Sequence, residues 1–248
     1  MGRPATYKVG YRGVTNAGFK YTLTKRLPKR RVIVTFDPPY EGSIEVGVGY
    51  IANGVIHNPF SPNKVGGMFG QGKYNCINSS KVHNIWYRLL ERVFHWERSV
   101  RNKSYEGCSV CEEWMNFQVF AEWYYSQKGS DMDWHLEKDL LVRGNKHYSP
   151  ETCVLVPQDV NMFLTKRKSC RTTLIGASYR AKTGRYLSQF TRGTKGVFLG
   201  SFATELEAHL AYKAAKEEYA RALAEKYKDV LDERAYLALL NYSVEIDD

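Results

Sequence analysis

Apolar side chains recur every three to four residues in three stretches of the chain, which predicts three helices with one buried face each. The helix expected at 81–98 would bury Ile85, Trp86, Leu89, Leu90, Val93 and Phe94. A second helix would bury Trp114, Phe117, Phe120, Ala121 and Tyr124. A third would begin at Thr204, which forms a capping-box pattern with Glu207, and would bury Ala208, Ala211, Tyr212, Ala215, Tyr219 and Leu223. A shorter helix is expected at 235–240.

Segments rich in β-branched and aromatic residues predict short strands between these helices. Near the start of the chain the expected strands are 19–23, 31–36 and 44–51, with a hairpin that turns at Asn53-Gly54 into 55–56. This spacing predicts a small barrel or curled sheet. Further strands are expected at 135–137, 153–156, 177–179, 186–190 and 197–199. The predicted fold class is therefore α+β.

Positive charge is concentrated in two parts of the sequence. The 248-residue chain has a formal net charge of +10. Residues 1–36 contain nine Lys or Arg and no acidic residue, and residues 166–195 again contain nine and none. Two acid-free basic blocks indicate two surfaces that hold a nucleic acid, and the alternative is an ordinary basic protein.

The cysteines and the apolar segments indicate the cellular compartment in which the protein would act. No apolar segment near the first residue resembles an export signal, and no apolar run is long enough to span a membrane. The five cysteines are sparse, which favours reduced thiols in the cytoplasm over a disulfide framework. Cys108 and Cys111 form a CxxC pair typical of half a zinc site, but no second pair follows. We expect these thiols and Cys153 to pack in the core, with zinc as the alternative.

A basic cluster falls between the first two long strands, where a hairpin would turn. It consists of Lys25, Arg26, Lys29, Arg30 and Arg31. Cations at the tip of a hairpin are well placed to contact phosphates, so Arg30 and Arg31 are predicted DNA contacts. The alternative is a solvated turn.

His135 lies within a dense set of possible metal ligands, namely Asp133, Glu137, Asp139, Asn145 and His147. Such a set suits metal-assisted hydrolysis of a phosphodiester. The histidine would take a proton from water, while a divalent cation stabilises the charge on the leaving oxygen. On a strand, His135 and Glu137 would share one face. On spacing alone, a surface hairpin of mixed charge without a metal is the alternative.

The segment HLEKDLLVRGNKHYSPETCVLVP, with the upstream GCSVCEEWMNFQVFAEW, resembles the HNH-type endonucleases of bacteriophages, which include homing endonucleases. The resemblance covers roughly residues 84–165 and rests on Val-Cys-x-x-Trp-x-x-Phe and Tyr-Ser-Pro-Glu-x-Cys. It implies a ββα-metal core, a Mg²⁺ or Mn²⁺ cofactor, double-stranded DNA as substrate, and a phage-encoded protein acting in the bacterial cytoplasm. In that family pattern, His135 and Asn145 would be catalytic, and the ligands would come from Asp133, Glu137, Asp139 and His147.

Two positions depart from the family pattern. Trp134 stands before the histidine, where Asp, Asn or His is common. Thr152 stands where a metal-binding Asn or His is common, and threonine is a poor ligand. A DNA-binding protein with a silent nuclease core is therefore the alternative function.

A second resemblance, over about 176–224, is to the AP2-type DNA-binding domain, a three-stranded sheet backed by one helix. It rests on Gly176, the Gly184-Arg185-Tyr186 triplet, Leu199-Gly200-Ser-Phe202, Thr204 and the helix around Ala211-Tyr212. Such sheets enter the major groove. The implied DNA contacts are Arg180, Lys182, Arg185, Tyr186, Gln189, Thr191, Arg192 and Lys195. Lys166, Arg167 and Lys168 form a basic linker suited to a phosphate backbone.

The predicted organisation has three modules and their connections. They are a small basic β module at 1–60, a linker at 61–82, an HNH-like core at 83–165, a basic linker at 166–175, an AP2-like domain at 176–228 and a tail at 229–248. The predicted function is metal-dependent cleavage of double-stranded DNA. The alternatives are a non-cleaving DNA-binding protein that acts as a phage regulator or as an inhibitor of a host system, and a module that binds a host protein through its basic surfaces.

Overall fold

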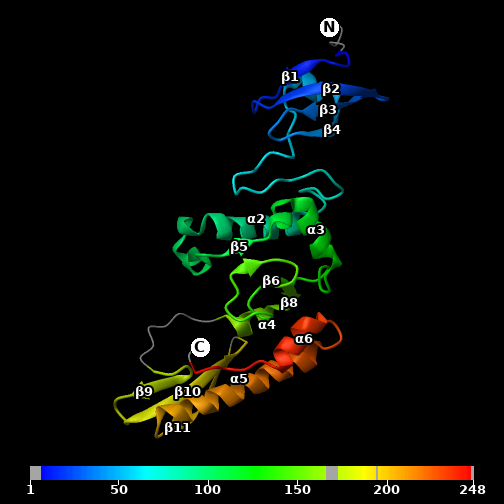
Figure 1. The fold of residues 1–248 in the computed structure, drawn as a ribbon. Helices are drawn as coiled ribbons and strands as arrows, with labels where there is room; N and C mark the ends of the chain where they lie inside the picture. Colours follow the sequence, from blue (N-terminus) through cyan, green and yellow to red (C-terminus); the bar gives the residue numbers. More distant parts are fainter. Residues whose placement is uncertain (1–6, 166–172, 194, 247–248) are drawn as a thin grey trace. The chain divides into compact units, whose positions relative to one another are not determined.

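A computed structural model describes residues 7–165, 173–193 and 195–246 of the chain. The chain divides into two compact units, Met1–Glu122 and Trp123–Asp248. Small antiparallel sheets and helices alternate along it, so the α+β class is confirmed (Figure 1). The predicted basic linker residues Lys166, Arg167 and Lys168, together with Cys170, lie outside the described residues.

The first unit opens with a four-stranded antiparallel sheet. Its strands, in the order β1-β2-β3-β4, are Arg12–Val14, Lys20–Leu27, Arg31–Phe36 and Gly42–Gly47. Alternate side chains point to one side and form a core with Tyr21, Leu23, Val32, Val34, Phe36, Ile51 and Ile56. The predicted strands at 19–23 and 31–36 are therefore confirmed.

The predicted hairpin at Asn53-Gly54 is wrong. Strand β4 ends at Gly47, and helix α1 spans Val48–Asn53. Gly54, at φ +66°, caps this helix in the left-handed conformation, and its N–H donates to the carbonyl of Ile51. An Asn-Gly pair suits a helix C-terminus as well as a hairpin turn, so local chemistry does not separate them. The helical turn places Ile51 on the core of the sheet.

The turn between β2 and β3 has an uncommon backbone. Lys29 and Arg30 adopt φ values of 55° and 58°, and no other non-glycine residue in the described part of the chain has a positive φ. The N–H of Arg31 donates to the carbonyl of Pro28 at 3.2 Å, and the N–H of Val48 donates to the carbonyl of Arg30 at 3.0 Å. Each such residue costs on the order of 1 kcal/mol, so the neighbouring structure enforces this turn.

Aromatic side chains build the core of the rest of this unit. Helix α2 spans Ser80–Phe94, the short helix η3 spans Glu112–Met115, and α3 spans Phe117–Ser126. All five residues expected on the second helix are fully buried. That helix is broken at Asn116, where the backbone is extended and the side-chain oxygen accepts the N–H of Gln118 at 2.9 Å. The remaining elements are η1 Trp96–Arg98, η2 Val100–Tyr105 and β5 Ser109–Val110.

The loop before α2 is held by one side chain of α3. Gln118 donates from Nε2 to the carbonyls of Phe69 and Tyr74, at 3.2 and 2.9 Å. Its Oε1 accepts the N–H of Tyr74 at 3.1 Å. The segment predicted as a linker thus packs on a helix.

The second unit contains a short hairpin followed by a helix. Strands β6 (His135–Glu137) and β8 (Val154–Val156) pair antiparallel, and α4 (Gln158–Leu164) follows directly. Strand β7 (His147–Tyr148) lies in the intervening loop. Valines and leucines of β8 are fully buried, as the apolar run predicted.

A three-stranded sheet and a long helix complete the second unit. The sheet order is β11-β10-β9, formed by Lys195–Phe202, Arg185–Arg192 and Ala177–Arg180, and the helices are α5 (Glu205–Tyr227) and α6 (Glu233–Leu240). The predicted capping box is confirmed: Thr204 accepts the N–H of Glu207, and Glu207 accepts the N–H of Thr204. Gly176, at φ +83°, lets the chain pass Tyr212, because a Cβ there would lie 2.1 Å from that ring.

Hydrogen bonds of four side chains fasten α5 and α6 to α4 and to the hairpin. Asp159 of α4 accepts hydrogen bonds from Lys226 Nζ at 2.7 Å and from the Tyr227 hydroxyl at 2.9 Å. The Asp159 carboxylate raises the pKa of Lys226. Arg234 of α6 donates to the carbonyls of Pro150 and Glu151, at 3.0 and 3.3 Å. The C-terminal helices therefore brace the loop that precedes β8.

Candidate functional site

His135 occupies an exposed position at the start of the β6–β8 hairpin. It pairs with Val156, and Glu137 pairs with Val154 at the other end of β6. His135 is solvent-exposed, whereas Glu137 is buried. The predicted shared face of the strand thus carries one side chain open to a ligand and one turned into the protein.

Glu137 organises the turn that leaves β6. Its Oε1 accepts the backbone N–H groups of Lys138 and Asp139, at 2.9 and 2.6 Å. Burial raises the pKa of this carboxyl above its ordinary value, and the two backbone N–H donors oppose the shift. At least one of its oxygens is therefore occupied by the protein itself.

Asn145 closes the same loop from the other side. Its Nδ2 donates to the carbonyls of Lys138 and His147, at 3.0 and 2.6 Å, and its Oδ1 accepts the N–H of His147 at 2.9 Å. Lys138 Nζ adds bonds to Asp139 Oδ1 at 2.6 Å and to the Asn145 carbonyl at 2.8 Å. The side-chain amide thus holds the loop in place through hydrogen bonds to its backbone.

The two departures from the HNH pattern have structural roles. Trp134 is buried, its ring lies 6.4 Å from that of Tyr227, and Gly129 allows its close approach. Thr152 Oγ1 donates to the carbonyl of His147 at 2.7 Å. Both side chains therefore stabilise the hairpin and its surroundings.

The predicted metal ligands do not form one compact cluster. Within the described residues, no three His, Cys, Asp or Glu side chains come close enough together to hold a metal ion. Asp133, Asp139 and His147 are exposed, while Glu137 is buried. Mg²⁺ is often bound by one or two carboxylates, with water and substrate phosphates completing the shell. The exposed carboxylates Asp133 and Asp139 fit that kind of site.

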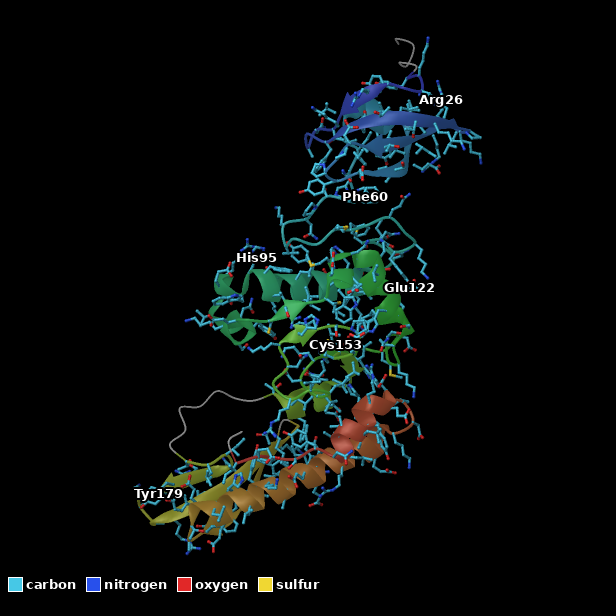
Figure 2. All side chains as sticks on the ribbon, in the orientation of Figure 1. Arg26, Phe60, His95, Glu122, Cys153 and Tyr179 are labelled. Atoms are coloured by element: carbon cyan, nitrogen blue, oxygen red, sulfur yellow. The ribbon has the colours of Figure 1, made fainter. Side chains whose placement is uncertain are left out.

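The cysteines behave as packing residues where they are buried. Cys153 (Figure 2) is fully buried, and burial raises the pKa of its thiol to about 12. Its predicted place in the core is confirmed. Cys108 is also buried, and Cys111 is partly exposed.

The sheet β9–β11 has two chemically different faces. Contacts of β10 with α5 identify the inner face: the Phe190 and Tyr219 rings lie 6.0 Å apart, and Ser188 is fully buried. Residues one position away on each strand therefore point outward. Among the predicted DNA contacts, those on the outer face are Arg180, Arg185, Gln189 and Thr191.

The other predicted contacts of this domain lie elsewhere. Tyr186 is on the inner side and packs against Tyr179 (labelled in Figure 2) in a tilted arrangement, with ring centroids 5.1 Å apart. Arg192 covers the ring of Tyr219 at 5.2 Å. Lys182 lies in the β9–β10 turn, and Lys195 begins β11; both are exposed. The sheet thus brings together half of the predicted set on one surface.

Two like charges face each other on the outer face. Arg180 and Arg185 are direct cross-strand partners, and both are exposed. Directly opposed like charges destabilise a sheet. Within the described residues, neither arginine forms a salt bridge. Arg185 is instead positioned by Ser201, whose hydroxyl and carbonyl accept its hydrogen bonds at 3.0 and 2.8 Å.

Sequence reasoning missed Phe198 on this surface. It pairs with Gln189, and 64% of its surface is exposed. A bulge opposite Ser188 and Gln189 adds one residue to β11 and shifts the alternation of side chains. That bulge sends Phe198 outward in an otherwise apolar run. Only the residue pairing reveals this orientation.

The two DNA contacts predicted in the first unit have different surroundings. Arg30 lies exposed at the tip of the β2–β3 turn. Arg31 instead pairs with Glu45 on β4.

No family model matches the chain, and comparison with curated proteins and with solved structures finds no match. In the part of the chain that the structure describes, no helix has the length and apolar character needed to cross a membrane.

Proposed function

We propose that the chain binds double-stranded DNA through the outer face of β9–β11. The observation that carries this proposal is the Arg180–Arg185 cross-strand pair, which the fold keeps although its charges repel each other. A polyanion would neutralise this pair. The block 166–195 has no acidic residue that could do so locally.

The side chains beside this pair suit the edges of bases. Gln189 can form two hydrogen bonds with adenine, Arg180 and Arg185 can do so with guanine, and an apolar group such as Phe198 can contact the thymine methyl group. A sheet of this size can enter the major groove. The resemblance to AP2-type domains supports the same mode of binding.

We propose as a second activity the metal-dependent hydrolysis of a DNA phosphodiester near His135. Its support is the exposed His135 on a strand–strand–helix unit and the resemblance to HNH endonucleases. His135 would accept a proton from water. Asp133 is the exposed carboxylate nearest to it in sequence and would be the first ligand of Mg²⁺ or Mn²⁺. The cation would stabilise negative charge on the leaving oxygen.

A silent core is the alternative, and specific contacts favour it. Glu137, Asn145 and Thr152 all bond to the loop backbone. A protein with such a core would act as a regulator by occupying DNA. The second alternative is a module that binds a host protein through its basic surfaces.

Binding is tested with the double variant Arg180→Ala/Arg185→Ala and a 30-bp duplex series. We expect affinity to fall about a hundredfold or more, since each good arginine contact contributes about 1–3 kcal/mol. The thermal midpoint should change little, because the removed repulsion offsets the lost hydrogen bonds from Arg185 to Ser201. Arg221→Ala, an exposed arginine on α5, is the matched control. Equal loss in both variants would contradict the assigned surface.

Cleavage is tested by plasmid nicking in Mg²⁺ and then Mn²⁺, with His135→Ala beside the parent protein. His57→Ala removes an exposed histidine of the first unit and serves as the control. Cation-dependent nicking that only His135→Ala abolishes would establish the nuclease. Plasmid that is shifted on a gel but never nicked would establish the silent alternative.

A further inference from the structure

The β2–β3 turn presents two cations in a backbone conformation that its residues disfavour. β-Turns with positive φ at both central positions normally carry Asn-Gly there. Here Lys29 and Arg30 occupy those positions. Hydrogen bonds to the carbonyls of Pro28 and Arg30 hold the turn from both sides. Backbone strain of this kind is concentrated at functional positions.

The charges at this tip are not neutralised by the protein. Lys25, Arg26, Lys29 and Arg30 are all exposed, and Arg26 is labelled on this hairpin in Figure 2. Within the described residues, none of these four side chains takes part in a salt bridge. Arg26 donates to the carbonyl of Tyr7 at 3.1 Å, and a carbonyl partner leaves the charge of the guanidinium in place.

We propose that the β2–β3 tip is a second DNA-binding element that contacts phosphates of the duplex outside the site read by β9–β11. This inference rests on the proposed function and extends the contact to the first unit of the chain. The tip holds its cations on a fixed backbone, so little freedom is lost on binding.

The composition of the tip favours duplex phosphates over single strands. Proteins that bind single strands combine cations with aromatic side chains on which bases stack. Residues 25–31 contain no aromatic side chain. Phosphate contacts of this kind carry no sequence information and make affinity depend on salt. The tip would therefore add affinity without changing the preferred sequence.

The test is the double variant Lys29→Asn/Arg30→Gly in the full chain. Asn-Gly is the pair this turn prefers, so the fold is retained, and the thermal midpoint should rise by about 2–6 °C as strain is relieved. Binding to a 40-bp duplex is measured from 50 to 300 mM salt. We expect the slope of log affinity against log salt to become shallower by about 2, and affinity at 100 mM salt to fall about tenfold or more.

The control variant Lys64→Asn/Lys103→Asn removes the same charge from two exposed lysines of the same unit. An equal loss of affinity in both variants would show that net charge alone sets the affinity, and it would overturn the proposal. Unchanged binding by the turn variant, with binding lost in Arg180→Ala/Arg185→Ala, would overturn the tip alone and leave the sheet's role standing. A parent protein that binds no duplex would overturn both. Loss of affinity only for a duplex RNA would assign the tip to RNA and overturn the DNA proposal.

Discussion

The outer face of β9–β11 and the β6–β8 hairpin use their polar side chains in opposite ways. On the sheet, Arg180 and Arg185 face each other, and within the described residues neither forms a salt bridge with a carboxylate. In the hairpin, Asn145 and Glu137 direct their polar atoms to the loop backbone. The first surface carries two opposed positive charges that form no salt bridge in the described part of the chain, whereas the polar atoms of the second are largely bonded to its own backbone.

DNA binding and DNA cleavage leave different signs in a protein without its ligands. A binding surface can be recognised without its partner, because uncompensated charge remains visible in the free protein. A cation-dependent site can be completed by substrate phosphates and water, so its free form need not contain a cluster of ligands. Variants of the hairpin must therefore be measured for both stability and nicking, so that a residue that stabilises the loop is distinguished from one that takes part in cleavage.

The largest expected effect on stability is that of Asn145→Ala. The change leaves the carbonyls of Lys138 and His147 and the N–H of His147 without their side-chain partner. We expect the free energy of unfolding to fall by about 2–3 kcal/mol, measured by urea denaturation. Asn161→Ala in α4 is the matched control. Unchanged stability together with lost nicking would show that Asn145 serves the chemistry, and would break the contrast between the two regions.

Phe198→Ala tests whether the outer face reads bases as well as phosphates. Phe198 is mostly exposed, so its loss should leave the thermal midpoint nearly unchanged. We expect affinity for the preferred duplex to fall about tenfold, with the salt slope unchanged, because an apolar contact releases no counterion. A shallower salt slope, or an equal loss of affinity for random-sequence DNA, would argue against a base contact.

Sequence periodicity predicted most elements because local patterns matched the tertiary structure. The capping box at Thr204, the buried residues of the second helix and the strands of the C-terminal sheet are examples. The Asn53-Gly54 turn failed because the same pair suits a helix end. Phe198 was missed because a bulge changes which side chains point outward. Roles that depend on strand pairing, or on hydrogen bonds within an irregular loop such as those of Asn145, leave no periodic pattern in the sequence.

Ser188→Ala examines the inner side of the sheet that bears the arginine pair. The Ser188 hydroxyl is fully buried, and within the described residues it has no hydrogen-bond partner. Removing it should raise the free energy of unfolding by about 1 kcal/mol, because an unsatisfied buried polar group is lost. DNA affinity should not change, since the residue lies behind the binding face. Lower stability would instead reveal a bond that the hydroxyl makes in solution.

The smallest expected effect concerns the pH dependence of the hairpin and is measured with Glu137→Gln. Burial raises the pKa of Glu137 in the folded state above 4.5, so between the two pKa values the folded state binds more protons than the unfolded state. Stability from this group is therefore present at low pH and declines as pH rises through that window. Glutamine keeps an oxygen that can accept the N–H groups of Lys138 and Asp139 but does not titrate. The thermal midpoint of the variant should thus fall less than that of the parent between pH 4 and 7. If the parent instead gained relative stability over this range, Glu137 would be stabilised as a carboxylate, as a residue prepared to hold a cation would be.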